Sequence, residues 1–307
     1  MSNPSELRII SLLPGATESV AALGLTQSLV GRSHECDYPP EVQQLPVCTQ
    51  ARLKSDRPSR EIDQDVKQLV ADALSIYQLD LDAIATLQPT HIITQDQCDV
   101  CAVSLPEVEA GLKQITGIQP QVISLQPISF GEIWTDLERL AKAFGISPQP
   151  ALSSLQKRAD ACLEKTRNLP KPTVIALEWL DPLMSAGSWL PELIAMAGGE
   201  CLLAEPGKRS PYLSWDALTN TNPDFIVIMP CGFDLDRTRS EAAVLPQHSD
   251  WGKLQAVQNR HVYITDGNAY FNRPGPRLVD SLEIMAEILH PGQFDRAYQG
   301  KGWDNFS

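Results

Sequence analysis

The sequence predicts an α/β protein made of two doubly wound α/β lobes that are joined by one long backbone helix. Short β-branched runs alternate with longer amphipathic stretches along the 307 residues, which is typical of parallel α/β units. The two halves also repeat one layout, because residues 87–94 (LQPTHIIT) and 221–228 (TNPDFIVI) each run from a helix end through a proline into a buried strand. The length supports this prediction, since chains of this size form roughly two domains.

Each predicted element follows from its own local pattern. Residues 129–144 form an amphipathic stretch, in which Ser129 and Glu132 make a capping box and Gly145 follows as the stop. Residues 277–290 carry one apolar stripe at helical spacing. The expected strands are residues 8–12, 29–31, 91–94, 121–124, 173–177, 225–229 and 261–265.

A helix between the two lobes is expected at residues 147–168. Pro148 is placed for the first turn and Pro170 ends the segment. Roughly 22 residues at 1.5 Å each would span about 33 Å, which is enough for one rigid connector. We therefore divide the chain into an amino-terminal lobe (1–146), a connecting backbone helix (147–170) and a carboxy-terminal lobe (171–307). A further helix begins near Ser59.

Charge and composition exclude several classes of partner. The 25 basic and 38 acidic residues give a net charge of −13, so the surface repels nucleic acid and anionic lipid. No window of eighteen apolar residues and no secretory signal is found, and seven cysteines suit a reducing compartment. We expect a monomer that binds no nucleic acid, enters no membrane and is cytoplasmic as the sequence stands, or periplasmic only if a leader was removed.

Several segments resemble a known family. They are RIISLLPGATESVAALGL, VGRSHECDYPPEV and LDAIATLQPTHIIT in the first half, and SAGSWLPELIAMAGGE and YLSWDALTNTNPDFIVI in the second. These segments are similar to the helical-backbone metal receptors, which include periplasmic binding proteins for vitamin B12, iron–siderophores and haem. The resemblance implies two lobes on one long helix, a ligand held in the cleft between them, and delivery to the permease of an ATP-driven (ABC) importer. One acidic residue in each lobe, Asp82 and Asp216, would dock on the transporter.

Ligands of parallel α/β sheets bind beyond the carboxyl ends of the strands, which selects loops at residues 13–17, 33–38, 95–101, 178–182, 230–233 and 266–273. These loops contain flat side chains that suit a large planar ligand such as a corrinoid, and polar side chains that could contact it. The predicted ligand-binding residues are Glu35, Tyr38, Gln95, Trp179, Asp266, Tyr270 and Phe271. The sequence contains no arrangement typical of catalysis, so we predict a binding protein and not an enzyme.

The same loops contain soft metal ligands, which supports an alternative. Thiolate and imidazole side chains at this spacing suit zinc, another soft metal or an iron–sulfur cluster, and the C-x2-C pair could also form a reversible disulfide or simply pack. The candidates are His34, Cys36, Cys98, Cys101 and Cys231. The leading hypothesis is thus a receptor for cobalamin, a related corrinoid or another small metal chelate. The alternative is a cytosolic thiolate protein that binds zinc, iron or an iron–sulfur cluster for storage, sensing or redox work.

Overall fold

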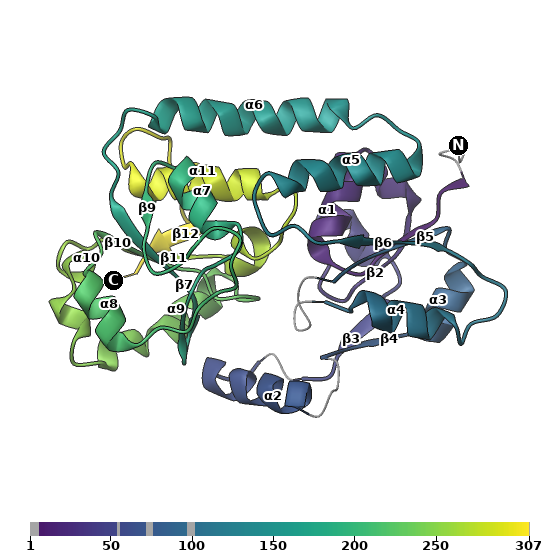
Figure 1. The fold of residues 1–307 in the computed structure, drawn as a ribbon, viewed down its shortest axis with the longest axis horizontal. Coiled ribbons are helices and arrows are strands. Elements are labelled where there is room, and N and C mark those ends of the chain that lie inside the picture. Colours follow the sequence, from purple (N-terminus) through teal and green to yellow (C-terminus); the bar gives the residue numbers. More distant parts are fainter. Residues whose placement is uncertain (1–5, 54–55, 72–75, 97–101, 307) are drawn as a thin grey trace. The chain divides into compact units, whose positions relative to one another are not determined.

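The computed structural model describes residues 6–53, 56–71, 76–96 and 102–306. By its contacts the chain divides into two compact units (Figure 1). Unit 1 consists of Met1–Arg57, Gln64–Pro127 and Gly131–Ser154, and unit 2 of Pro58–Asp63, Ile128–Phe130 and Leu155–Ser307. The three-part division at residues 146 and 170 stays a prediction.

Unit 1 is built on a four-stranded parallel sheet with the strand order β2-β1-β5-β6. The strands are β1 (Ile9–Ser11), β2 (Leu29–Arg32), β5 (His91–Gln95) and β6 (Gln121–Leu125). Ile9 packs with α1 (Pro14–Ala22) and α5 (Glu132–Phe144). Ile10, the next residue, packs on the opposite side with α3 (Leu81–Leu87) and α4 (Leu105–Leu112). Successive strand side chains point to opposite faces, so helices cover both faces of this sheet.

A second, two-stranded sheet in unit 1 lies next to the end of β2. It pairs β3 (Thr49–Ala51) with β4 (Tyr77–Leu79) in antiparallel register, with Ala51 opposite Tyr77. An isolated bridge between Arg32 and Val47 connects β2 to the residues that precede β3. This connection positions Thr49 and Tyr77 near the loop that follows β2.

Unit 2 is built on a six-stranded mixed sheet with the order β12-β11-β10-β7-β8, in which β9 also pairs with β7. The pairings of β7 with β9, β10 with β7 and β10 with β11 are parallel, while β8 and β12 are antiparallel. The strands are β7 (Thr173–Leu180), β8 (Leu183–Ser185), β9 (Glu200–Cys201), β10 (Phe225–Ile228), β11 (Val262–Thr265) and β12 (Trp303–Asn305).

Helices also cover both faces of the unit 2 sheet. One face packs against α8 (Trp215–Thr221), α9 (Leu235–Ala242) and α10 (Gln255–Gln258) in a single apolar core. On the other face α7 (Leu190–Met196) packs against α11 (Leu278–Leu289). The predicted α/β fold class, with doubly wound parallel sheets, is confirmed.

The repeated layout found in the sequence is a repeated structure. In unit 1 the Asp80 side chain accepts a hydrogen bond from the Ala83 amide and begins α3, and in unit 2 Ser214 does the same for Ala217 and α8. Each helix has seven residues and ends at a left-handed residue, Gln88 (φ 46°) or Asn222 (φ 44°), before a proline and a buried parallel strand. A left-handed residue commonly ends a helix, which explains why the two patterns produce the same turn.

All seven predicted strands are confirmed, and so are the helices at residues 129–144 and 277–290, with ends shifted by at most three residues. The predicted capping box of Ser129 and Glu132 is wrong. α5 begins at Glu132 after Gly131, no side chain caps it, and Ser129 lies outside the helix. Gly145, with φ 69°, ends α5 as predicted.

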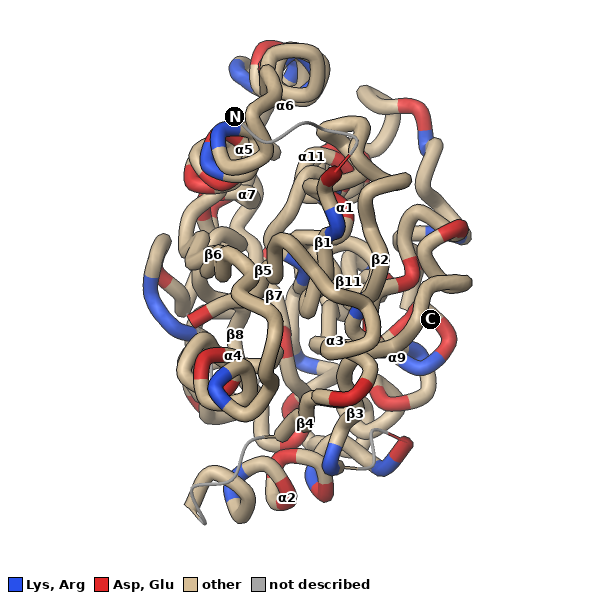
Figure 2. The backbone as a smooth tube through the Cα atoms, turned by 90° about the vertical axis from the view of Figure 1, so that its right-hand side faces the viewer, with Lys and Arg blue, Asp and Glu red and all other residues tan. Residues whose placement is uncertain are grey.

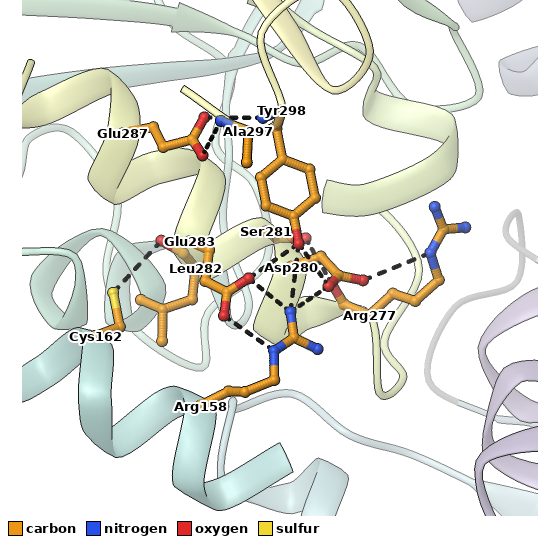
Figure 3. Close-up of polar contacts among 10 residues, drawn as sticks. All are labelled: Arg158, Cys162, Arg277, Asp280, Ser281, Leu282, Glu283, Glu287, Ala297 and Tyr298. Carbon is orange, nitrogen blue, oxygen red and sulfur yellow. Dashed lines mark hydrogen bonds and ion pairs between the residues drawn. The ribbon is translucent and has the colours of Figure 1, made fainter. Parts of the chain in front are cut away.

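The long helix predicted at residues 147–168 is α6 (Gln149–Thr166), and the division between the units falls within it. It contains both basic and acidic residues (Figure 2). In its unit 2 portion Arg158 donates to Asp280 (2.5 Å) and Glu283 (2.6 Å), and Tyr298 donates to both carboxylates (Figure 3). These contacts fix α6 to α11 and to the carboxy-terminal segment.

Candidate functional site

Arg32, the last residue of β2, donates hydrogen bonds to backbone carbonyl groups of the loop that follows this strand. One guanidinium nitrogen of Arg32 donates to the carbonyl oxygens of Ser33 (3.0 Å) and Cys36 (3.1 Å), and the other donates to that of Gln43 (3.1 Å). Because the loop follows the carboxyl end of a parallel strand, its side chains lie where ligands of such sheets bind.

His34 is the half-buried centre of this loop. Its Nδ1 lies 2.8 Å from Thr49 Oγ1, and its backbone amide donates to the same oxygen at 3.1 Å. Burial, together with the nearby positive charge of Arg32, lowers the pKa of His34, so that the neutral imidazole is favoured at neutral pH. A neutral imidazole is the form that can coordinate a metal.

Glu35 and Tyr77 lie next to His34. The Tyr77 hydroxyl donates to Glu35 Oε1 at 3.0 Å, and the Tyr77 ring lies 5.5 Å from the His34 ring at a tilt of 44°. Tyr77 itself is buried, so it positions Glu35 and lines one side of His34. No local pattern indicates this contact, because Tyr77 lies in β4, more than forty residues from Glu35.

Tyr38 is the exposed aromatic residue of the same loop, with 44% of its surface accessible. Two other predicted residues are buried: Cys36 is 1% exposed and Gln95 is 2% exposed. The Cys36 sulfur accepts a hydrogen bond from the Thr17 hydroxyl at 3.0 Å. Both side chains therefore serve the interior of unit 1 in this structure. Cys98 and Cys101 lie outside the described residues.

In unit 2, Trp179 lies near the carboxyl end of β7 and is partly exposed. Its Nε1 donates to the Ser59 carbonyl oxygen at 3.2 Å, and its ring lies 5.3 Å from that of Phe233. Arg237 covers Phe233 at 3.9 Å from the ring centre. These contacts orient the indole while leaving part of it accessible.

Glu178, the residue before Trp179, was not among the predicted site residues. Its carboxylate accepts a hydrogen bond from the Ser210 hydroxyl at 2.8 Å, and Ser210 Oγ accepts one from the Gly187 amide. Burial raises the pKa of Glu178, and the hydrogen bonds from Ser210 and the Gly187 amide oppose that rise. Gly187 is required here, because a Cβ would lie 2.6 Å from the Lys208 carbonyl oxygen.

The predicted residues after β11 lie around the π-helix η6 (Gly267–Phe271). Asp266 caps it by accepting from the Ala269 amide at 2.6 Å, and burial raises the pKa of Asp266. The Tyr270 ring packs between Arg277, 4.5 Å from its centre, and Tyr298. Phe271 is 0% exposed, so it has no open face on which a ligand could stack in this conformation. The pattern of loop residues could not distinguish a buried ring from an exposed one.

The predicted soft-metal ligands do not form a cluster in the described ranges. Cys231, after β10, is exposed. Within residues 6–53, 56–71, 76–96 and 102–306, no three histidine, cysteine or acidic side chains come together as a metal site. Within these ranges His34 is therefore a single potential metal ligand and does not belong to a cluster of ligands.

Asp82 and Asp216, the predicted docking residues, are both exposed. Each is the second residue of its helix, α3 in unit 1 and α8 in unit 2, following the capping residue by two positions. Neither carboxylate forms a salt bridge with another residue of the described chain.

The family model described as periplasmic binding protein matches residues 9–269. The chain belongs to the periplasmic binding protein family. A vitamin B12-binding protein of Photorhabdus laumondii is 24% identical over 295 residues, which cover 92% of this chain and 88% of that protein. An ABC transporter substrate-binding lipoprotein of Bacillus subtilis, YvrC, is 22% identical over 296 residues (94% and 81%). A periplasmic haem-binding protein from Pseudomonas aeruginosa has the same fold, with a TM-score of 0.69, 20% identity and 98% of each chain covered.

The predicted cytoplasmic location was wrong, because the family is periplasmic and the B. subtilis relative is named a lipoprotein. The cysteine count does not indicate the compartment, since buried thiols are small apolar side chains wherever the protein is located. Burial raises the pKa of Cys48 and of Cys201 to about 11. Among the described residues, no helix combines the length and the apolar character needed to cross a membrane.

Proposed function

We propose that this protein is the substrate-binding component of an ABC-type importer and that it captures a metal held in a planar macrocycle, a corrinoid or a haem. The family match supports a binding protein and not an enzyme. The names of the relatives and structural neighbours, which bind vitamin B12 or haem, support this class of ligand.

The observation that carries the proposal is the repeated acidic position. Asp82 and Asp216 are equivalent residues of the same helix–turn–strand repeat, one in each unit. Both are exposed, and neither has an ion-pair partner in the described chain, so both are available to basic residues of a partner. A receptor that presents one such carboxylate on each unit suits a transporter with a pair of basic docking sites.

The strand ends provide the ligand contacts in this proposal. Tyr38, in the loop after β2 of unit 1, and Trp179, near the carboxyl end of β7 in unit 2, offer accessible aromatic surface. Glu35, held by Tyr77, supplies a polar contact in unit 1. Phe271, Gln95 and Cys36 have no such role here, because they are buried.

The test is titration of the purified protein with hydroxocobalamin and with haemin, followed by tryptophan fluorescence and absorbance. Trp179→Ala and Tyr38→Ala should each weaken binding of the preferred macrocycle about tenfold, the loss expected when roughly 1.4 kcal/mol of contact is removed. Trp215→Phe is the control, since Trp215 stacks on His248 at 3.9 Å and is not at a strand end. Unchanged affinity in both alanine variants would refute these ligand contacts.

A further inference from the structure

His34 has one ring nitrogen fixed by the protein and one that is not used by it. Nδ1 lies 2.8 Å from Thr49 Oγ1. Nε2 makes no hydrogen bond or ion pair with any residue of the described ranges. The side chain is half-buried, so it is accessible to a ligand at the end of β2.

The hydrogen bonds around Thr49 favour one tautomer of His34. The Thr49 hydroxyl can donate to Ser33 Oγ, 3.0 Å away, while its oxygen accepts from Nδ1–H of His34. In this tautomer the lone pair of the neutral imidazole is on Nε2. A histidine that binds a metal characteristically donates its other ring N–H to a fixed acceptor, which sets its tautomer and orientation.

The surroundings of His34 are rigid enough to hold the ring in place. Arg32 donates to the Ser33 and Cys36 carbonyl oxygens on either side of His34 in the sequence. The buried Tyr77 ring lies against the imidazole at 5.5 Å. The loop follows β2, the Thr49 hydroxyl lies in β3 and the Tyr77 ring lies in β4. Three separate segments therefore set the orientation of the His34 ring.

A single imidazole cannot hold a bare metal ion well, because protein sites for such ions use three or four protein ligands. In the ranges that the structure describes, no group of three potential ligands is present. The sulfur of Cys36, two residues away, is buried against Thr17. A metal that binds here must bring its own equatorial donors.

The geometry points to His34 Nε2 as an axial nitrogen ligand for a metal whose four equatorial positions are filled by a macrocycle. Coordination replaces one axial water by the Nε2 lone pair, with no change of oxidation state. The inference rests on the proposed function, because it assumes that a metal-containing macrocycle is the ligand. It adds the residue that touches the metal and makes Thr49 a positioning residue.

The experiment uses haemin and hydroxocobalamin as probes with the full-length protein. The wild type and the control His248→Gln should give the absorption spectrum of an axial nitrogen ligand with at least one probe. His34→Ala should lose that spectrum and bind roughly tenfold or more weakly, and millimolar imidazole should restore the spectrum. Thr49→Val should still bind the probe but with a shifted spectrum. If the His34→Ala variant does not fold, His34→Gln replaces it, with the same expected loss of the spectrum and of affinity.

Three outcomes would overturn the inference. If a probe binds the wild type and His34→Ala with the same spectrum, His34 is not the ligand, although the proposed function stands. If Zn²⁺ or Co²⁺ alone binds the wild type stoichiometrically and His34→Ala does not bind it, the site is one for a bare ion. If neither probe binds the wild type, the proposed function fails together with the inference.

Discussion

Asp82 and Asp216 occupy the same position in two copies of one structural repeat: each is the second residue of a seven-residue helix that ends in a left-handed residue and leads into a buried parallel strand. The two carboxylates are exposed in their own units. The helix caps are supplied by Asp80 and Ser214 and not by these two side chains. The equivalence of Asp82 and Asp216 supports the docking role that we propose.

The double variant Asp82→Lys/Asp216→Lys should abolish uptake of the ligand by cells that depend on this protein, because it places positive charges against basic docking residues. Ligand affinity of the purified variant should stay within about twofold of the wild type, since the strand ends are untouched. The measurement pairs cellular uptake of labelled ligand with an in vitro titration. Normal uptake by the double variant would show that Asp82 and Asp216 do not dock on the transporter.

The Arg158 cluster should carry a measurable part of the stability of unit 2. Arg158→Ala removes the cation that Asp280 and Glu283 share, although Arg277 stays 3.8 Å from Asp280, so the free energy of unfolding should fall by about 1–2 kcal/mol. Arg167→Ala, directly after the end of α6, is the matched control, because its pair with Glu164 is mostly exposed, and it should change stability by less than about 0.5 kcal/mol. Urea unfolding of both variants measures these changes. Equal losses of stability would mean that the cluster in Figure 3 stabilises the protein no more than an exposed ion pair does.

Asp136 should make the stability of unit 1 depend on pH. Burial raises its pKa from 3.8 to about 6, and its Oδ2 has no hydrogen-bond partner in the described chain. The folded state thus binds a proton on Asp136 more readily than the unfolded state does. The free-energy penalty for burying the ionised carboxylate is therefore absent below about pH 4, grows as the pH rises to about 6, and is constant above that.

Asp136→Asn removes that penalty and should stabilise the protein at pH 7 by about 1–3 kcal/mol, with little effect near pH 4. Glu138→Gln, on the exposed face of the same helix, is the control and should be neutral at both pH values. Denaturation curves at the two pH values measure the difference. A variant that is less stable than the wild type at pH 7 would show that the ion pair with Arg139 outweighs the burial.

The parallel strands β1, β5, β10 and β11 could be predicted from the sequence because each is a short run rich in β-branched residues and buried at every position. The helix ends were harder to predict, as α5 shows: Ser129 and Glu132 have capping-box spacing, yet the helix begins at Glu132 without a side-chain cap. The strand β3 and its partner β4 were missed, because each has only three residues and their pairing joins segments that are far apart in the sequence.

The rule that ligands bind beyond strand ends selects the loop that contains His34 and Tyr38, whereas Trp179 lies within β7, which continues to Leu180. The sequence could not show which side chains of the predicted loops are buried or which distant residues they contact. Phe271 and Trp179 looked alike as loop aromatics, but only Trp179 keeps accessible surface. The contacts of Tyr77 with Glu35 and of Ser210 with Glu178 join distant segments, so no local pattern could reveal them.

The most direct test of the account is equilibrium dialysis of the native protein against hydroxocobalamin, haemin, Zn²⁺ and Co²⁺, with bound metal measured by mass spectrometry. The account predicts one equivalent of cobalt or iron bound with its macrocycle, and no stoichiometric binding of either bare ion. A folded protein that retains neither macrocycle, or that fills with a bare ion, would contradict it.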